Sequence, residues 1–210
     1  MKKKIFVFLA VLIVLSFIPM ASLYAEANSI SYIGAAWDIP SPTVYVTLQK
    51  GIDSSYKTAA FDAVNIWMAK LGSNFSYTPV DSSTKKNPAK ITITIKKNTG
   101  NILGTTRISS AAGNLTGISI TMASQNAMGK PLEPVDFKNI LMHELGHAFG
   151  LGHANDDGIG LKDLMYPYYD FTTVGYAVPP SDFDISALLA IYTSDGFAGD
   201  NNAIPSVYTK

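Results

Sequence analysis

Three histidines and one glutamate stand at a spacing that can bind a metal ion and activate water. The segment from His143 to His153 (HELGHAFGLGH) contains all three histidines of the chain. Side chains four residues apart share one face of a helix, so His143 and His147 can both reach a single ion. Gly150 stands where the helix has to end and the chain has to turn back, because glycine tolerates positive φ. His153 can then supply a third ligand.

Three neutral nitrogen ligands are typical of a catalytic zinc site. Such a set leaves one coordination position for water, whereas structural zinc sites are closed by four protein ligands. Zinc lowers the pKa of that water to about 7. Glu144, next to the first histidine, can take the proton as the water attacks a peptide carbonyl and pass it to the leaving amine. The pattern predicts one Zn²⁺ bound by His143, His147 and His153, with Glu144 as the general base.

This motif and a later methionine resemble those of the metzincin zinc peptidases. Residues 163–167 (DLMYP) resemble the Met-turn of the matrixin family, and Met165 follows the third histidine by twelve residues. The resemblance implies that Met165 forms an apolar floor beneath the metal. It also implies that residues 103–107 form an edge strand that pairs with an extended substrate, and that a pocket beside it takes the residue after the scissile bond. The implied substrate-binding residues are Leu103, Thr105, Pro167 and Tyr169.

Several residues depart from the matrixin pattern. Ala154 directly follows the third histidine, where matrixins usually have serine. A second, structural zinc is predicted to be absent, because no histidine is left to bind it. Pro167 stands where astacin-like and serralysin-like relatives have a tyrosine ligand, so no tyrosine ligand is assigned. Asp156, Asp157 and Asp170 leave a structural Ca²⁺ open, since scattered acids do not identify a calcium site.

The N-terminus has the organisation of a secretory signal peptide. Three lysines precede an apolar run at residues 5–19, and the triplet Ala25-Glu26-Ala27 fits the small-residue cleavage site. We predict a signal peptide over residues 1–27 and one catalytic domain over residues 28–210, with cleavage after Ala25 as the alternative. An uncleaved membrane anchor is the other alternative, although the run is short for a span of ~20 residues. The expected location is extracellular.

Composition and charge narrow the classes of partner. The chain has 210 residues, 47% hydrophobic and 15% charged, as expected for one globular domain. Its 16 basic and 16 acidic residues balance without long runs of one sign, which argues against nucleic-acid binding. Cysteine is absent from the sequence. This excludes thiolate zinc sites, a thiol nucleophile and the cysteine latch of matrixin propeptides.

Hydrophobic periodicity indicates an α+β chain. Helices are expected over residues 54–71, 134–150 and 181–192. Strands are expected over residues 44–48, 75–80, 91–95, 105–108 and 118–122. Polar loops are expected over residues 81–90 and 109–117, and residues 193–210 predict no element. Together with the resemblance, this favours a metzincin-like catalytic domain with a twisted five-stranded mixed sheet and three helices.

The main hypothesis is a secreted, monomeric zinc endopeptidase that acts on polypeptide and does not insert into a membrane after signal cleavage. A second hypothesis is an inactive binding module that keeps the metzincin fold at a surface. The presence of Glu144 and all three histidines argues against it, since such modules would typically have lost one of them. A third hypothesis is a zinc hydrolase acting on a non-peptide amide.

Overall fold

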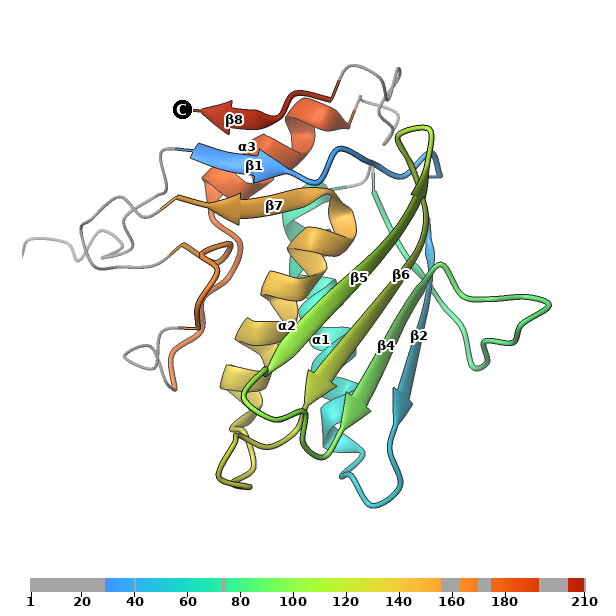
Figure 1. Cartoon of the computed structure of the whole chain (residues 1–210), viewed down its shortest axis with the longest axis vertical. Helices are drawn as coiled ribbons and strands as arrows, with labels where there is room; N and C mark the ends of the chain where they lie inside the picture. Colours follow the sequence, from blue (N-terminus) through green and yellow to red (C-terminus); the bar gives the residue numbers. More distant parts are fainter. Residues whose placement is uncertain are drawn as a thin grey trace, which may run out of the picture.

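A mixed sheet of five strands forms the largest layer of the molecule (Figure 1). The computed structural model describes residues 29–39, 41–72, 75–155, 163–169, 175–192 and 204–209. The strand order is β3 (Thr78–Pro79), β2 (Thr43–Leu48), β4 (Ile91–Lys96), β6 (Asn114–Ala123) and β5 (Gly104–Ala111). Neighbouring strands are parallel except β5, which is antiparallel to β6 and forms one edge. The predicted five-stranded mixed sheet is confirmed.

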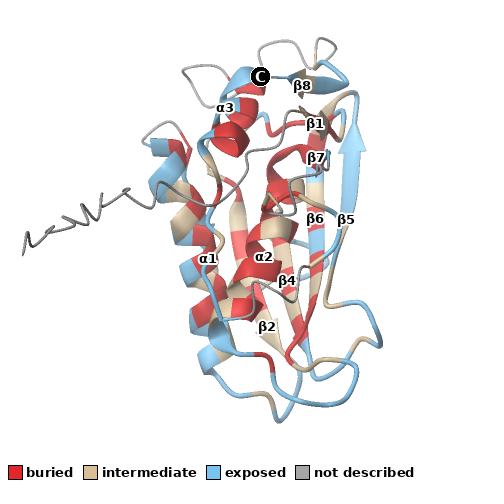
Figure 2. Cartoon of the chain, turned by 90° about the vertical axis from the view of Figure 1, so that its left-hand side faces the viewer, coloured by how far each residue is buried: buried red, intermediate tan, exposed pale blue. Residues whose placement is uncertain are grey.

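Two long helices cover one face of this sheet (Figure 2). These are α1 (Ser55–Leu71) and α2 (Pro134–Phe149), close to the predicted ranges. The two tryptophans of the chain fix α2 in place. The indole N–H of Trp67 donates to the carbonyl of Met142 at 2.9 Å, and that of Trp37 donates to the carbonyl of Ala148 at 2.8 Å. Because both indoles are fully buried, these bonds are shielded from water.

A third helix, α3 (Asp182–Ile191), lies at the end of the molecule near the C-terminus (Figure 1). Its predicted start is confirmed. Ser181 accepts a hydrogen bond from the backbone N–H of Asp184, and the Asp184 side chain accepts one from the backbone N–H of Ser181. This reciprocal pair satisfies two backbone donors at the helix start. The three predicted helices are therefore all present.

A second sheet of three short strands was not predicted. Its order is β7 (Leu151–Ala154), β1 (Ser29–Tyr32) and β8 (Val207–Thr209), with β1 antiparallel to both neighbours. Strands of three or four residues carry too little alternation for a sequence signal. The sheet matters for the site because β7 carries His153, and the hydroxyl of Ser31 on β1 donates to the carbonyl of that histidine at 3.1 Å.

Two sequence predictions about the sheet were wrong. Residues 109–117, expected to be a loop, form the end of a hairpin between β5 and β6, with Ala112 and Gly113 at its tip. Both tip residues have positive φ, as a tight two-residue hairpin turn requires. The predicted strand over residues 75–80 is reduced to two residues, and Phe75 instead packs its ring against Phe149.

The predicted signal peptide lies outside the described residues. Of the helices that the structure describes, none is both long and apolar enough to cross a membrane.

Candidate metal centre

The three histidines converge at the C-terminal end of α2. His143 and His147 project from α2, and His153 comes from β7 after the chain turns at Gly150, whose φ is 120°. Their ligand nitrogens all lie within 4.8 Å of one another. The Nε2 atoms of His143 and His147 are 3.2 Å apart. Two nitrogens bound to one tetrahedral zinc at ~2.0–2.1 Å would be about 3.3 Å apart, so this pair fits the ion closely.

Backbone carbonyls fix the direction in which two of these rings present their lone pairs. The Nδ1 of His143 lies 2.7 Å from the carbonyl of Leu164, and the Nδ1 of His147 lies 2.9 Å from that of Leu151. A carbonyl oxygen only accepts, so each Nδ1 must carry the proton and donate it. Each Nε2 then keeps its lone pair for a metal.

The pKa values of all three histidines are lowered, which favours their neutral form. Burial, followed by the charge of neighbouring His147, lowers the pKa of His143 to about 3. Burial lowers the pKa of His147 to about 4 and also lowers that of His153. A metal must compete with protons for these nitrogens, so a low pKa keeps them free to bind at neutral pH. Among the described residues, these three form the one group of histidines and acids placed to hold an ion.

Glu144 lies beside the histidines and against the edge strand β5. Its carboxyl group accepts a hydrogen bond from the hydroxyl of Thr106 at 2.6 Å. A Cβ at Gly104 would lie 2.6 Å from Oε1, so only glycine leaves room for the carboxyl group there. Burial raises the pKa of Glu144 to about 7, against the lowering effect of the Thr106 hydrogen bond. The result is a buried carboxyl group that can change protonation near neutral pH.

Met165 packs directly against α2 at Gly146. It is fully buried, and a Cβ at Gly146 would overlap its sulfur and lie 2.8 Å from its Cε. The backbone N–H of Met165 donates to Asp163 at 2.9 Å, and its carbonyl accepts from the N–H of Ala154. Met165 therefore packs on the helix that carries His143 and His147, and Gly146 is what lets it approach that helix.

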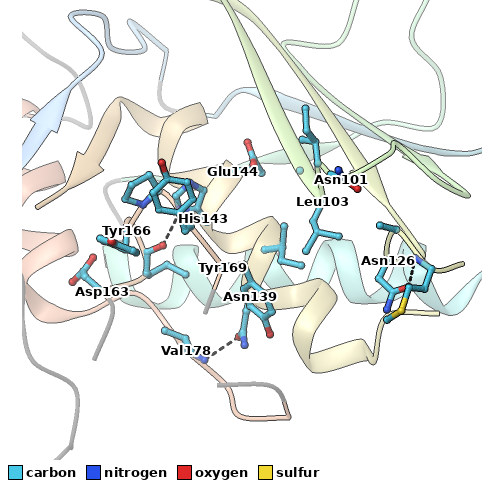
Figure 3. Close-up of a pocket in the computed structure, with 18 residues that line it drawn as sticks. Asn101, Leu103, Asn126, Asn139, His143, Glu144, Asp163, Tyr166, Tyr169 and Val178 are labelled. Carbon is cyan, nitrogen blue, oxygen red and sulfur yellow. Dashed lines mark hydrogen bonds between the residues drawn. The ribbon is translucent and has the colours of Figure 1, made fainter. Parts of the chain in front are cut away.

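A cavity of about 630 Å³ opens next to Glu144 (Figure 3). Its walls come from the start of β5, from α2 and from the segment that follows Met165. The apolar and aromatic side chains lining it include Leu103, Ile140, Leu164, Pro167, Tyr169 and Val178. Three of the four predicted substrate-binding residues thus reach the cavity. Thr105 does not, because it is exposed on the opposite face of β5 from Thr106.

The family model for matrixins matches residues 52–193, which is more than half of the chain. The chain belongs to the matrixin family. Comparison with the curated proteins finds no match. The matched stretch of this matrixin runs from just before α1 to just after α3, so it includes the three histidines, Glu144 and Met165. Matrixins are zinc metallopeptidases, and the three histidines could hold the ion.

Sequence reasoning missed three residues that support the site of this matrixin. Gly104 and Thr106 contact Glu144, and Gly146 contacts Met165. The alternation of β5 placed Gly104 and Thr106 on one face, but nothing in the sequence showed which helix that face meets. Gly146 falls on an unspecified position of the zinc motif. The acids considered for calcium, Asp156, Asp157 and Asp170, lie outside the described residues.

Proposed function

We propose that this matrixin is a secreted zinc endopeptidase that hydrolyses extended polypeptides. The observation that carries the proposal is the convergence of three histidine nitrogens beside the buried Glu144, at the mouth of a cavity. His143, His147 and His153 would hold one zinc ion, which supplies Lewis-acid polarisation of the peptide carbonyl and activates water. The predicted signal peptide supports export.

Glu144 would carry the proton during hydrolysis. Its carboxylate accepts a proton from the attacking water and later donates it to the nitrogen of the leaving amine. A pKa near the working pH suits a group that has to do both. The Thr106 hydroxyl restricts the rotation of the Glu144 carboxyl group, and the glycine at position 104 leaves space for it against β5.

The free edge of β5 would bind the substrate backbone. Because β5 pairs with β6 on one side only, its other side offers backbone groups to an extended peptide. Thr105 lies on this strand and Leu103 just before it, and Leu103, Pro167 and Tyr169 line the cavity. The side chain after the scissile bond would enter the cavity, whose apolar lining favours an apolar residue.

The test compares cleavage of casein by the purified mature protein and by its Glu144→Ala variant. We expect a loss of at least ~10²–10⁴ in rate with zinc content unchanged. Glu133→Ala, an exposed acid at the start of the same helix, is the matched control and should cleave normally. Equal cleavage by Glu144→Ala, or a wild type without zinc, would contradict the proposal.

Two rival functions give different results in the same assay. A binding module of the metzincin fold would contain zinc but leave casein intact. A hydrolase for non-peptide amides would cleave small amide substrates in preference to mapped peptides. Both rivals would leave the proposed role of the β5 edge without support.

A further inference from the structure

Two buried polar side chains near the start of α2 bind the cavity wall that lies opposite β5. This wall consists of Tyr169 and residues 175–178. Asp136 is 4% exposed and Asn139 is 3% exposed, and they stand one helical turn apart. Neither belongs to the zinc motif. Among the described residues, no cation forms a salt bridge with Asp136. The desolvation cost of a buried carboxyl group that has no cation beside it must be offset by hydrogen bonds. The partners in those bonds therefore identify the part of the chain that Asp136 positions.

One oxygen of Asp136 accepts hydrogen bonds from two parts of this wall. Its Oδ1 accepts a hydrogen bond from the hydroxyl of Tyr169 at 2.6 Å and another from the backbone N–H of Gly175 at 2.9 Å. The φ of Gly175 is +83°, a conformation that favours glycine. Asp136 therefore holds the ring of Tyr169 in place as one lining of the cavity.

Asn139 fastens the next part of the same wall. Its Nδ2 donates to the carbonyl of Tyr176 at 2.6 Å, and its Oδ1 accepts from the backbone N–H of Val178 at 2.9 Å. Figure 3 shows the second of these bonds as a dashed line beneath the cavity. The backbone over residues 175–178 is in neither a helix nor a strand, so α2 supplies hydrogen bonds that regular structure would otherwise provide.

We propose that Asp136 and Asn139 are positioning residues that determine which side chains the cavity admits. The inference rests on the proposed peptidase function. Tyr169 and Val178 both line the cavity, and both are hydrogen-bonded to α2. Fixing their distance from α2 fixes the depth of the cavity. A long apolar side chain depends on that depth, whereas alanine does not reach it.

The test uses two peptides that differ only in having Leu or Ala after the mapped scissile bond. In Asp136→Ala we expect the Leu-over-Ala preference in kcat/KM to fall about tenfold, through KM, with kcat changed less than about twofold and zinc content unchanged. Asp136→Asn keeps an Oδ1 acceptor and should retain the preference within about threefold. Glu133→Ala removes a negative charge from the same helix end without touching the wall and should behave as the wild type.

Binding of the same peptides to the Glu144→Gln protein repeats the comparison without turnover. If the wild type cleaves neither peptide, the peptidase function has failed, and the binding preference with and without Asp136→Ala still decides this inference. An unchanged preference in Asp136→Ala, by cleavage or by binding, would overturn it. An equal loss in kcat for both peptides would also overturn it, because that outcome indicates a general structural defect.

Discussion

The two ends of α2 serve the same cavity in different ways. At the C-terminal end, the helix itself displays the reactive groups, because His143, Glu144 and His147 follow helical spacing. At the N-terminal end, Asp136 and Asn139 hold a wall built from irregular chain. The first arrangement is local and the second is tertiary. Variants at the metal end should therefore change rate or stability and leave the Leu-over-Ala preference unchanged. Variants at the wall should change that preference and leave kcat nearly unchanged.

The largest change in stability expected at the metal end is that of zinc-stripped protein. The ordinary pKa of glutamate is 4.5, and burial raises that of Glu144 to about 7. Because the folded state binds this proton more tightly than the unfolded state, the raised pKa adds to the free energy of unfolding. This contribution is fully present below pH 4.5 and is lost as the pH rises through 7. Between about pH 5 and about pH 8, the wild type should lose on the order of 3 kcal/mol in unfolding free energy relative to Glu144→Gln.

Urea denaturation at the two pH values measures this difference. Glu133→Gln, an exposed change at the same helix, should follow the wild type at both. A difference between wild type and Glu144→Gln that is the same at both pH values would show that Glu144 is not buried as a titrating group.

A smaller loss of stability is expected for Gly146→Ala. The added Cβ overlaps the side chain of Met165, which has to move away from the helix. Overpacking of this kind costs roughly 1–3 kcal/mol. Gly117→Ala is the control, because its Cβ would be 4.0 Å from the nearest atom. Urea curves that coincide for Gly146→Ala and Gly117→Ala would show that Met165 does not pack against α2 at Gly146.

The smallest effect is expected for Thr106→Val, which keeps the shape of the side chain and removes its hydroxyl. Without the hydrogen bond to Glu144, kcat should fall about tenfold, equivalent to ~1.4 kcal/mol, with the Leu-over-Ala preference unchanged. Thr106→Ser restores the hydroxyl and should recover most of the rate. A variant that changed the preference and not kcat would break the division between the two ends of α2.

The metal end could be predicted from sequence because its signal is periodic. The four-residue spacing of His143 and His147 and the stop at Gly150 indicate one helix face and its end. In the same way, Ile91, Ile93 and Ile95 alternate with threonine, and all three isoleucines are fully buried in β4. Helix and strand periods of 3.6 and 2 residues can be read from a short stretch of sequence without knowledge of the rest of the chain.

The remaining features depend on contacts between distant residues. Thr106 and Glu144 are 38 positions apart, and Ser31 and His153 are 122 apart. No local pattern links such pairs, so the support of Glu144 and the pairing of β1 with β7 were not predicted. The hairpin tip at Ala112 was missed for another reason. Residues 107–112 are exposed, so burial leaves no alternation there to indicate a strand.

Zinc titration of metal-stripped protein tests the central claim most directly. Casein cleavage by the wild type should rise in proportion to added zinc and level off at one ion per chain. Glu144→Gln should bind the same single ion and show almost no cleavage. Cleavage by the wild type without zinc, or full cleavage by zinc-loaded Glu144→Gln, would contradict a zinc peptidase that uses Glu144 as its base.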